Sequence, residues 1–251
     1  MKLKITFVLS AILLLLMSVA SSASMLIPAN DNAKENSKAP ENSPAIGDEW
    51  NLERVDFVHY AQSVNPAKAP HTDSCYKLMG VKWLSLPVSY SVNPFNTQGL
   101  PEGFVTSTVS VSAETWDAAT SKELFNDAYS VDYTAVYGVR DYENAIVFGD
   151  YGQSNVIGVT SVWYTRVGKQ IVEFDMLLND QFQWGDASVD PTKMDLQNIL
   201  THELGHSVGM SDIYTSTCSA VTMYGYSNNG DLQKRSLEQP DITGLQKMYG
   251  M

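Results

Sequence analysis

The hydrophobic and polar positions divide the chain into an apolar leader, a polar stretch and a long patterned region. Residues 5–19 are almost wholly apolar and follow a short basic segment at residues 1–4. Their apolar run of about 13 to 16 residues is shorter than the roughly 20 that a membrane-spanning helix needs. Small residues typical of a cleavage site follow the run, at 18–20 and 21–23. We therefore predict a signal peptide over residues 1–23.

Residues 24–70 are polar and interrupted by proline, a composition that cannot build a hydrophobic core. We interpret this stretch as a linker or a pro-region. Within it, residues 49–62 carry enough apolar side chains to dock on another part of the protein. Two interpretations of this segment stay open: a short pro-segment that covers a cleft, or an edge strand of the mature domain.

The remaining pattern, over residues 71–251, predicts one α+β domain. Alternating or continuous apolar runs predict strands at 88–92, 133–139, 145–148, 156–164 and 171–178. Helical spacing predicts a long helix from Pro101 to about Phe125, a second helix that begins near Met194, and a proline-initiated helix over 239–249.

The charge balance excludes one class of partner. The chain holds 28 acidic against 16 basic residues, a net charge of −12, whereas a nucleic-acid interface needs a basic surface. Because no later segment matches the apolar leader, we expect a secreted mature protein that has no membrane segment. We also expect it to bind no nucleic acid and to act as a monomer. Acidity alone identifies no substrate.

The second helix carries the candidate chemistry. His202 and His206 are four residues apart, so both imidazoles project from one helix face and can share a metal ion. Glu203 lies one step round the helix, where it can take a proton from a metal-bound water. Gly209 is suited to end the helix in a left-handed conformation, and that turn can bring Asp212 to the same metal.

The sequence H-E-x-x-H-x-x-G-x-x-D at 202–212, followed by V-T-M-Y-G at 221–225, resembles the metzincin zinc peptidases with their Met-turn. Asp212 stands where that family usually has histidine, as in its snapalysin-like branch. A three-histidine site would need His59 or His71, because no histidine follows His206. The resemblance also implies that Met223 forms an apolar floor beneath the metal.

The order of elements over about residues 80–251 resembles the catalytic domain of matrixins. This resemblance implies a twisted, mostly parallel five-stranded sheet with a long helix, an active-site helix and a C-terminal helix. It also implies a secreted zinc endopeptidase in which Glu203 is the general base and a protein or peptide substrate lies along strand 156–164. The alternative is a non-catalytic exported protein whose zinc only stabilises the fold, although such a site has no use for Glu203.

Two further sites depend on pairs or groups of side chains. In an exported protein, Cys75 and Cys218 favour a disulfide. A cysteine switch that blocks zinc through Cys75 is the other interpretation, although the residues around Cys75 lack the matrixin switch motif.

Calcium is a further candidate cofactor, which could bind through the carboxylates of Asp150, Asp175 and Asp180. No calcium-loop spacing is present, and solvated side chains are the simpler interpretation of these three residues.

Overall fold

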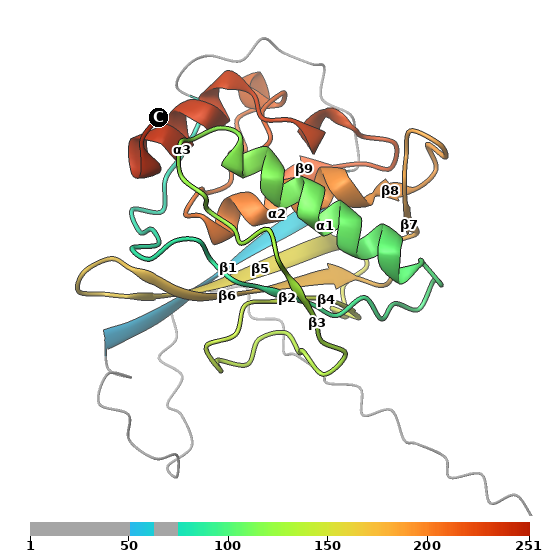
Figure 1. Cartoon of the computed structure of the whole chain (residues 1–251). Helices are drawn as coiled ribbons and strands as arrows, with labels where there is room; N and C mark the ends of the chain where they lie inside the picture. The colour runs from blue at the N-terminus through green and yellow to red at the C-terminus, as the bar shows by residue number, and fades with distance from the viewer. Residues whose placement is uncertain (1–50, 63–74) are drawn as a thin grey trace, which may run out of the picture. The chain divides into compact units, whose positions relative to one another are not determined.

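The computed structural model describes residues 51–62 and 75–251 (Figure 1). The predicted signal peptide, most of the polar stretch and His71 lie outside these residues. Within the described ranges, no helix is long and apolar enough to cross a membrane.

Three α-helices, two 3₁₀ helices and nine strands make up the described chain. The helices are α1 (Glu102–Asp117), α2 (Leu196–Ser207), α3 (Gln239–Tyr249), η2 (Ser216–Cys218) and η3 (Gln233–Arg235). The strands are β1 (Leu52–Ala61), β2 (Ser91–Val92), β3 (Ser130–Val131), β4 (Ala145–Gly149), β5 (Val156–Thr165), β6 (Ile171–Asn179), β7 (Trp184–Gly185), β8 (Met194–Asp195) and β9 (Tyr226–Ser227).

Seven strands form one sheet, in the order β3-β2-β4-β6-β5-β1-β9. Four of its neighbouring pairs are parallel, and only β5 pairs antiparallel, with β6 on one side and β1 on the other. The mostly parallel α+β sheet of the prediction is therefore confirmed. Its strand count is larger than the predicted five, because β1 and β9 extend the sheet beyond β5.

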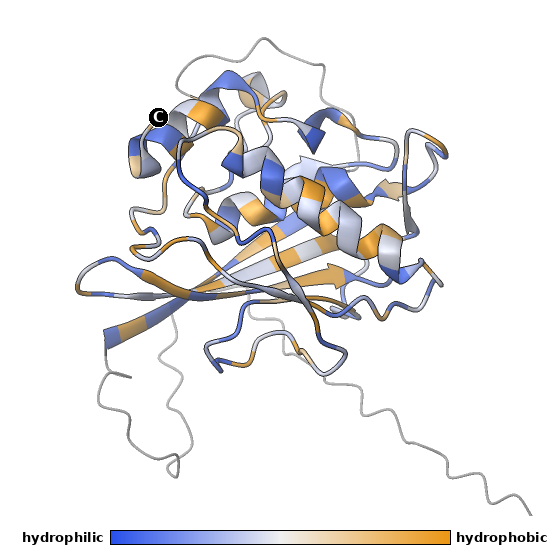
Figure 2. Ribbon diagram, viewed as in Figure 1, coloured by the Kyte–Doolittle hydropathy of each residue, from blue (hydrophilic) through white to orange (hydrophobic). Residues whose placement is uncertain are grey.

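The three helices lie over one face of this sheet (Figure 1). Hydrophobic positions recur along the central strands and on the helices that cover them (Figure 2). Trp116 of α1 is fully buried, and its indole nitrogen donates a hydrogen bond to the Thr201 carbonyl of α2, 2.8 Å away. This contact fixes α1 against α2, so α2 is enclosed between α1 and the sheet.

The hydrophobic runs located the central strands and the C-terminal helix correctly. β4, β5 and β6 agree with the predicted ranges to within a residue, because their side chains are almost all buried. Helix α3 begins at Gln239 as predicted, with Pro240 in its first turn. Glu238 and Asp241 close this end with a capping box.

Two predicted elements near the middle of the chain were wrong. Helix α1 ends at Asp117 and not near residue 125, because the Asp117 carboxylate accepts hydrogen bonds from the backbone nitrogens of Leu124 (2.6 Å) and Phe125 (3.3 Å). Residues 133–139 form turns instead of a strand, and the nearest strand is β3 at 130–131. Gly138 there has a positive φ of 82°, and its nitrogen donates to Asp175.

Strand β1 pairs with β5, the strand along which the resemblance places a substrate. Nine of its residues pair with β5, from Leu52 opposite Thr165 to Tyr60 opposite Val156. At its C-terminal end β1 also pairs in parallel with β9, where Tyr60 lies opposite Tyr226. The part of the predicted segment that the structure describes therefore docks on the domain, between β5 and β9.

Cys75 and Cys218 are joined by a disulfide across a sequence separation of 143 residues. Both residues are buried, in a small cluster with Val221 and Tyr224. The pairing confirms the predicted disulfide and leaves Cys75 bonded to sulfur rather than placed against the histidines of α2.

We expect the purified, denatured protein to have no titratable thiol, because both of its cysteines are used in this bond. The measurement is thiol titration under denaturing conditions, with a sample reduced beforehand as the positive control. Two free thiols in the unreduced sample, or activation of the protein by a thiol-modifying reagent, would instead favour the switch.

Candidate metal centre

Helix α2 places two histidines inside the protein. Its first turn is capped by Asp195, whose side chain accepts a hydrogen bond from the Asn198 nitrogen at 2.8 Å. Arg235 holds the same carboxylate from the other side, with its Nε 2.8 Å from Oδ1. His202 and His206 then project from one face of the helix, and their Nε2 atoms are 3.2 Å apart.

Backbone carbonyls fix the tautomer of both imidazoles. The Nδ1 atom of His202 lies 2.7 Å from the Thr222 oxygen, and that of His206 lies 3.0 Å from the Met210 oxygen. A carbonyl oxygen only accepts, so each Nδ1 carries the hydrogen and each Nε2 keeps a free lone pair. Two lone pairs that face each other at this distance repel unless a cation lies between them.

Asp212 brings a third acceptor to the same point. Its Oδ1 lies 3.2 Å from His202 Nε2 and 3.5 Å from His206 Nε2. Within the described chain this buried oxygen has no hydrogen-bond partner, whereas Oδ2 accepts from the Tyr214 hydroxyl at 3.0 Å. Two imidazole nitrogens and one carboxylate oxygen are a donor set that suits zinc, so the three residues fit a zinc ion with a position left for water.

The charge of His202 and of Asp212 depends on their burial and on the side chains beside them. Burial lowers the pKa of His202 to about 3, which keeps its imidazole neutral and available as a ligand. Burial alone would raise the pKa of Asp212, but the imidazoles of His206 and His202 hold it well below its usual range. Asp212 is therefore an anion, and a deprotonated carboxylate is the form that binds a metal.

The turn after α2 delivers Asp212 as the sequence predicted. Gly209 has a φ of 98°, in the left-handed region that favours glycine. A Cβ atom at this position would lie 2.4 Å from the Val81 carbonyl oxygen, so the turn also requires the absence of a side chain. The chain can then reverse and place Asp212 six residues beyond His206, against the same face of the helix.

Glu203 lies beside the cluster but is held by other residues. Its Oε2 accepts a hydrogen bond from the Thr160 hydroxyl of β5 at 2.6 Å, and its Oε1 lies 3.2 Å from His59 Nδ1. The side chain is fully buried, and this burial raises the pKa of Glu203 to about 7. A carboxylate with a pKa near neutrality is suited to accept a proton and to release it again.

Met223 is fully buried and packs against α2 at Gly205. A Cβ atom at Gly205 would lie 2.3 Å from the Met223 sulfur and 2.6 Å from a ring carbon of Trp116. The glycine that weakens α2 is therefore required by close packing. That Met223 forms an apolar floor beneath a metal stays a prediction.

Sequence reasoning missed three residues that surround the cluster. Phe57 stacks on the His206 ring at a centroid distance of 4.1 Å, and the His59 ring lies 3.9 Å from that of His202. Lys234, on η3, is almost fully buried beside His59. His59 was considered only as a substitute ligand, and Lys234 has no motif in the sequence that could have indicated it.

The three carboxylates considered for calcium do not meet in one site. Asp175 is buried and accepts from the backbone nitrogens of Gly138 and Ala145, at 2.7 and 3.3 Å. Asp150 accepts from Gly152 and Gln181. In the described residues, the two groups able to hold a metal contain neither these nor Asp180; they are His202 with His206 and Asp212, and His59 with His202 and Glu203.

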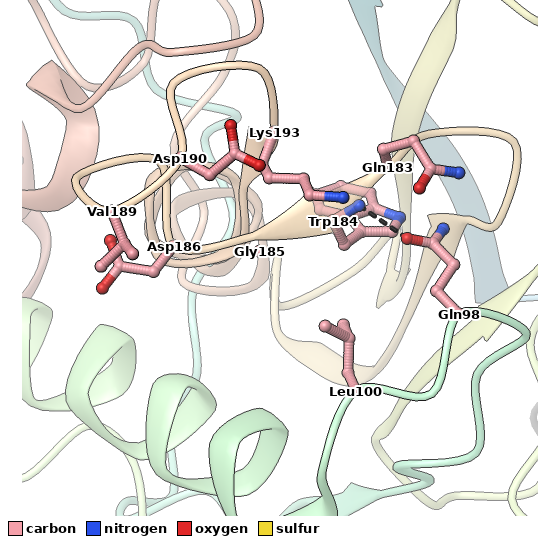
Figure 3. Close-up of a pocket in the computed structure, with 9 residues that line it drawn as sticks. All are labelled: Gln98, Leu100, Gln183, Trp184, Gly185, Asp186, Val189, Asp190 and Lys193. Carbon is pink, nitrogen blue, oxygen red and sulfur yellow. Dashed lines mark hydrogen bonds between the residues drawn. The ribbon is translucent and has the colours of Figure 1, made fainter.

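A separate hollow lies beside strand β7 (Figure 3). It is lined by Gln98, Leu100, Gln183, Trp184, Gly185, Asp186, Val189, Asp190 and Lys193. Gln98 accepts from the Trp184 backbone nitrogen at 2.7 Å and donates to backbone oxygens, so its polar atoms are already used. This hollow shares no residue with the metal cluster.

Comparison with known proteins agrees with this geometry. The matrixin model of the M10 peptidases matches residues 82–250. The chain is 31% identical to Homo sapiens matrilysin over 176 residues, which cover 67% of this chain and 59% of matrilysin. It is 25% identical to Mus musculus stromelysin-1 over 171 residues, or 67% of this chain and 33% of that protein. The chain thus spans less than two thirds of either relative.

The packing at Gly205 gives a prediction about stability. We expect Gly205→Ala to lower the free energy of unfolding by about 1–3 kcal/mol, because the added methyl group overlaps Met223 and Trp116. Gly103→Ala in α1 is the matched control, since a Cβ there meets no atom within 4 Å. Urea unfolding of both variants measures the difference, and an equally stable Gly205→Ala protein would contradict this account of the packing.

Proposed function

Because this chain belongs to the matrixin family of peptidases, we propose that it is a secreted, zinc-dependent endopeptidase. The observation that carries the proposal is the convergence of three buried acceptor atoms, one each from His202, His206 and Asp212. The apolar leader and the disulfide support export to an oxidising compartment.

In this proposal His202, His206 and Asp212 hold the zinc ion. Zinc bound there would supply a Lewis acid that lowers the pKa of a water molecule and polarises the scissile carbonyl. The backbone carbonyls behind both imidazoles keep their Nε2 atoms unprotonated, so the ligands are ready without a change of tautomer.

Glu203 is the proposed general base. It is next to His202 in sequence but outside the set of three ligands, and Thr160 fixes its carboxylate from β5. From this position it would take a proton from the attacking water and return it to the leaving amide nitrogen. A site whose zinc only stabilises the fold would not need such a group, and its burial would be costly.

The substrate would lie extended along β5 and pair with it through backbone hydrogen bonds. Strand β1 now pairs with that edge, so a substrate would have to replace it. This supports the interpretation of residues 49–62 as a pro-segment that covers the cleft. Phe57 and His59 of β1 lie against the histidine rings, and the paired edge of β5 continues past them in both directions, which suits an endopeptidase.

A casein digestion assay with and without a zinc chelator tests the proposed function. We expect digestion by protein recovered from the export medium, loss of digestion with chelator, and recovery when zinc is restored. Stoichiometric zinc in a protein that digests neither casein nor gelatin would favour the alternative, a zinc ion with a purely structural role.

Replacing Glu203 gives the sharpest test of mechanism. We expect Glu203→Ala to bind zinc and fold as the parent does but to lose at least about 100-fold in the rate of casein cleavage, because general-base catalysis contributes roughly that much or more. Zinc content and melting temperature are measured alongside the rate. Glu143→Ala, at an exposed position, is the control, and retention of more than a few per cent of activity in Glu203→Ala would exclude the base role.

Asp212 is the ligand for which this chain departs from the commoner family pattern. Asp212→Ala should lose zinc as well as activity, since two histidines alone hold the ion weakly. Asp212→His should retain zinc, because a third imidazole replaces the carboxylate at the same spacing. Zinc content after dialysis against a weak chelator measures both, with the exposed Asp127→Ala as control. If Asp212→Ala holds zinc as tightly as the parent, the third ligand lies elsewhere.

A further inference from the structure

Lys234 is a buried basic group with no carboxylate of the described chain in contact. Its side chain is only 1% exposed, and its ammonium donates to the Tyr224 carbonyl oxygen and lies 3.1 Å from His59 Nε2. Across the described ranges it forms no ion pair with a carboxylate. Burying an ammonium group in this way is unfavourable, and an anionic partner in direct contact would offset that cost.

His59 fills the space between this ammonium and the metal cluster. Its ring lies 3.9 Å from that of His202, and its Nδ1 is 3.2 Å from Glu203 Oε1. At the far side of the ring, Nε2 is 3.2 Å from the Ser227 hydroxyl and 3.1 Å from Lys234 Nζ. The imidazole thus extends from the proposed general base to the lysine.

The far end of this space is lined by hydrogen-bond donors. The side-chain nitrogen of Asn198 donates a hydrogen bond to the Ser227 hydroxyl oxygen at 3.5 Å. The hydroxyl hydrogen of Ser227 is therefore free to point towards His59. The Lys234 ammonium can only donate. The position of His59 Nε2 therefore suits an acceptor, and an anionic acceptor would also neutralise the lysine.

Strand β1 enters this space in the manner of a bound peptide. It runs antiparallel to β5, with His59 opposite Gly158, and parallel to β9. The Tyr60 backbone nitrogen donates to the Gly225 carbonyl oxygen at 3.5 Å, and the Gln62 backbone nitrogen donates to the Ser227 carbonyl oxygen at 3.0 Å. A peptide that replaces β1 between the same two strands would place one side chain where His59 now lies.

We propose that this pocket, formed by Asn198, Ser227 and Lys234, selects a glutamate side chain of the substrate. The inference rests on the proposed function and names the residue next to which the peptide is cut. A glutamate carboxylate reaches about as far from its backbone as the imidazole Nε2 does, whereas aspartate is one methylene shorter. Its oxygens would accept from both Ser227 and Lys234, and charge-assisted bonds of this kind are the stronger ones.

Strand β1 of the full chain provides a first test, because it is an internal ligand of the pocket. The probe is residue 59 itself, compared as His59→Glu and His59→Gln, two side chains of equal shape and different charge. We expect amide hydrogen exchange along β1 to be roughly tenfold slower in His59→Glu than in His59→Gln, since only the first gives Lys234 an anionic partner. His59→Lys should show the fastest exchange.

The matched background is Lys234→Met, which keeps the length of the side chain and removes its charge. There the advantage of His59→Glu over His59→Gln should disappear or reverse. Melting temperatures show whether each variant is folded. If Lys234→Met does not fold, the order of the β1 exchange rates among the Glu, Gln and Lys variants of residue 59, measured with Lys234 in place, decides the proposal. Faster exchange in His59→Glu than in His59→Gln, or an advantage that persists in Lys234→Met, would overturn the proposal.

A peptide series provides the second test. Four peptides that differ only in having Glu, Gln, Leu or Lys at one position are incubated with the zinc-loaded protein, and mass spectrometry locates the cuts. We expect kcat/KM for Glu to exceed that for Gln by about tenfold, with cleavage next to the glutamate, and this preference to be lost in Lys234→Met.

The two tests separate the pocket from the activity. If Leu or Lys is the preferred side chain, the pocket assignment is wrong while the peptidase function stands. If the zinc-loaded protein cuts neither casein nor any of the peptides, the proposed function is wrong and the substrate preference falls with it. Hydrogen exchange in β1 still decides in that case whether the pocket takes a glutamate side chain.

Discussion

Three lone pairs meet in the interior of this protein with no hydrogen placed between them. His202 and His206 each use Nδ1 on a backbone carbonyl, and Asp212 uses one carboxylate oxygen on Tyr214. The remaining acceptor of each residue faces the other two, at 3.2 to 3.5 Å. A cation at the centre would remove this repulsion, and the burial of α2 and the turn at Gly209 bring the three acceptors to that one point.

Strand β5 links this cluster to the edge on which β1 lies. Thr160 fixes the Glu203 carboxylate, and a Cβ at Gly158 would lie 3.2 Å from the same carboxylate. The backbone of the same strand forms the edge with which β1 pairs. The proton acceptor and the peptide-binding edge therefore share one rigid element, which sets the distance of Glu203 from any extended chain on β5.

The features that the sequence predicted correctly are those determined by local pattern. Spacing on one helix brings His202 and His206 together, and a single glycine turn adds Asp212. The strands β4 to β6 followed from nearly continuous burial. The predicted strand at 133–139 failed because Asp175, more than thirty residues away in sequence, holds the Gly138 backbone in a turn. His59 and Lys234 are 175 residues apart and meet only through the tertiary fold, so no spacing rule could have paired them.

In the proposed function β1 and a substrate compete for the same edge of β5, and the covalent attachment of β1 sets the strength of that competition. The strand ends at Ala61, and the chain continues without a break to Cys75, which the disulfide anchors to Cys218. Pairing of β1 with β5 is therefore an intramolecular event, governed by an effective concentration that a free peptide has to exceed. One backbone cut between Ala61 and Cys75 would turn the same contacts into a bimolecular equilibrium, in which β1 is diluted away although no contact at that edge has changed.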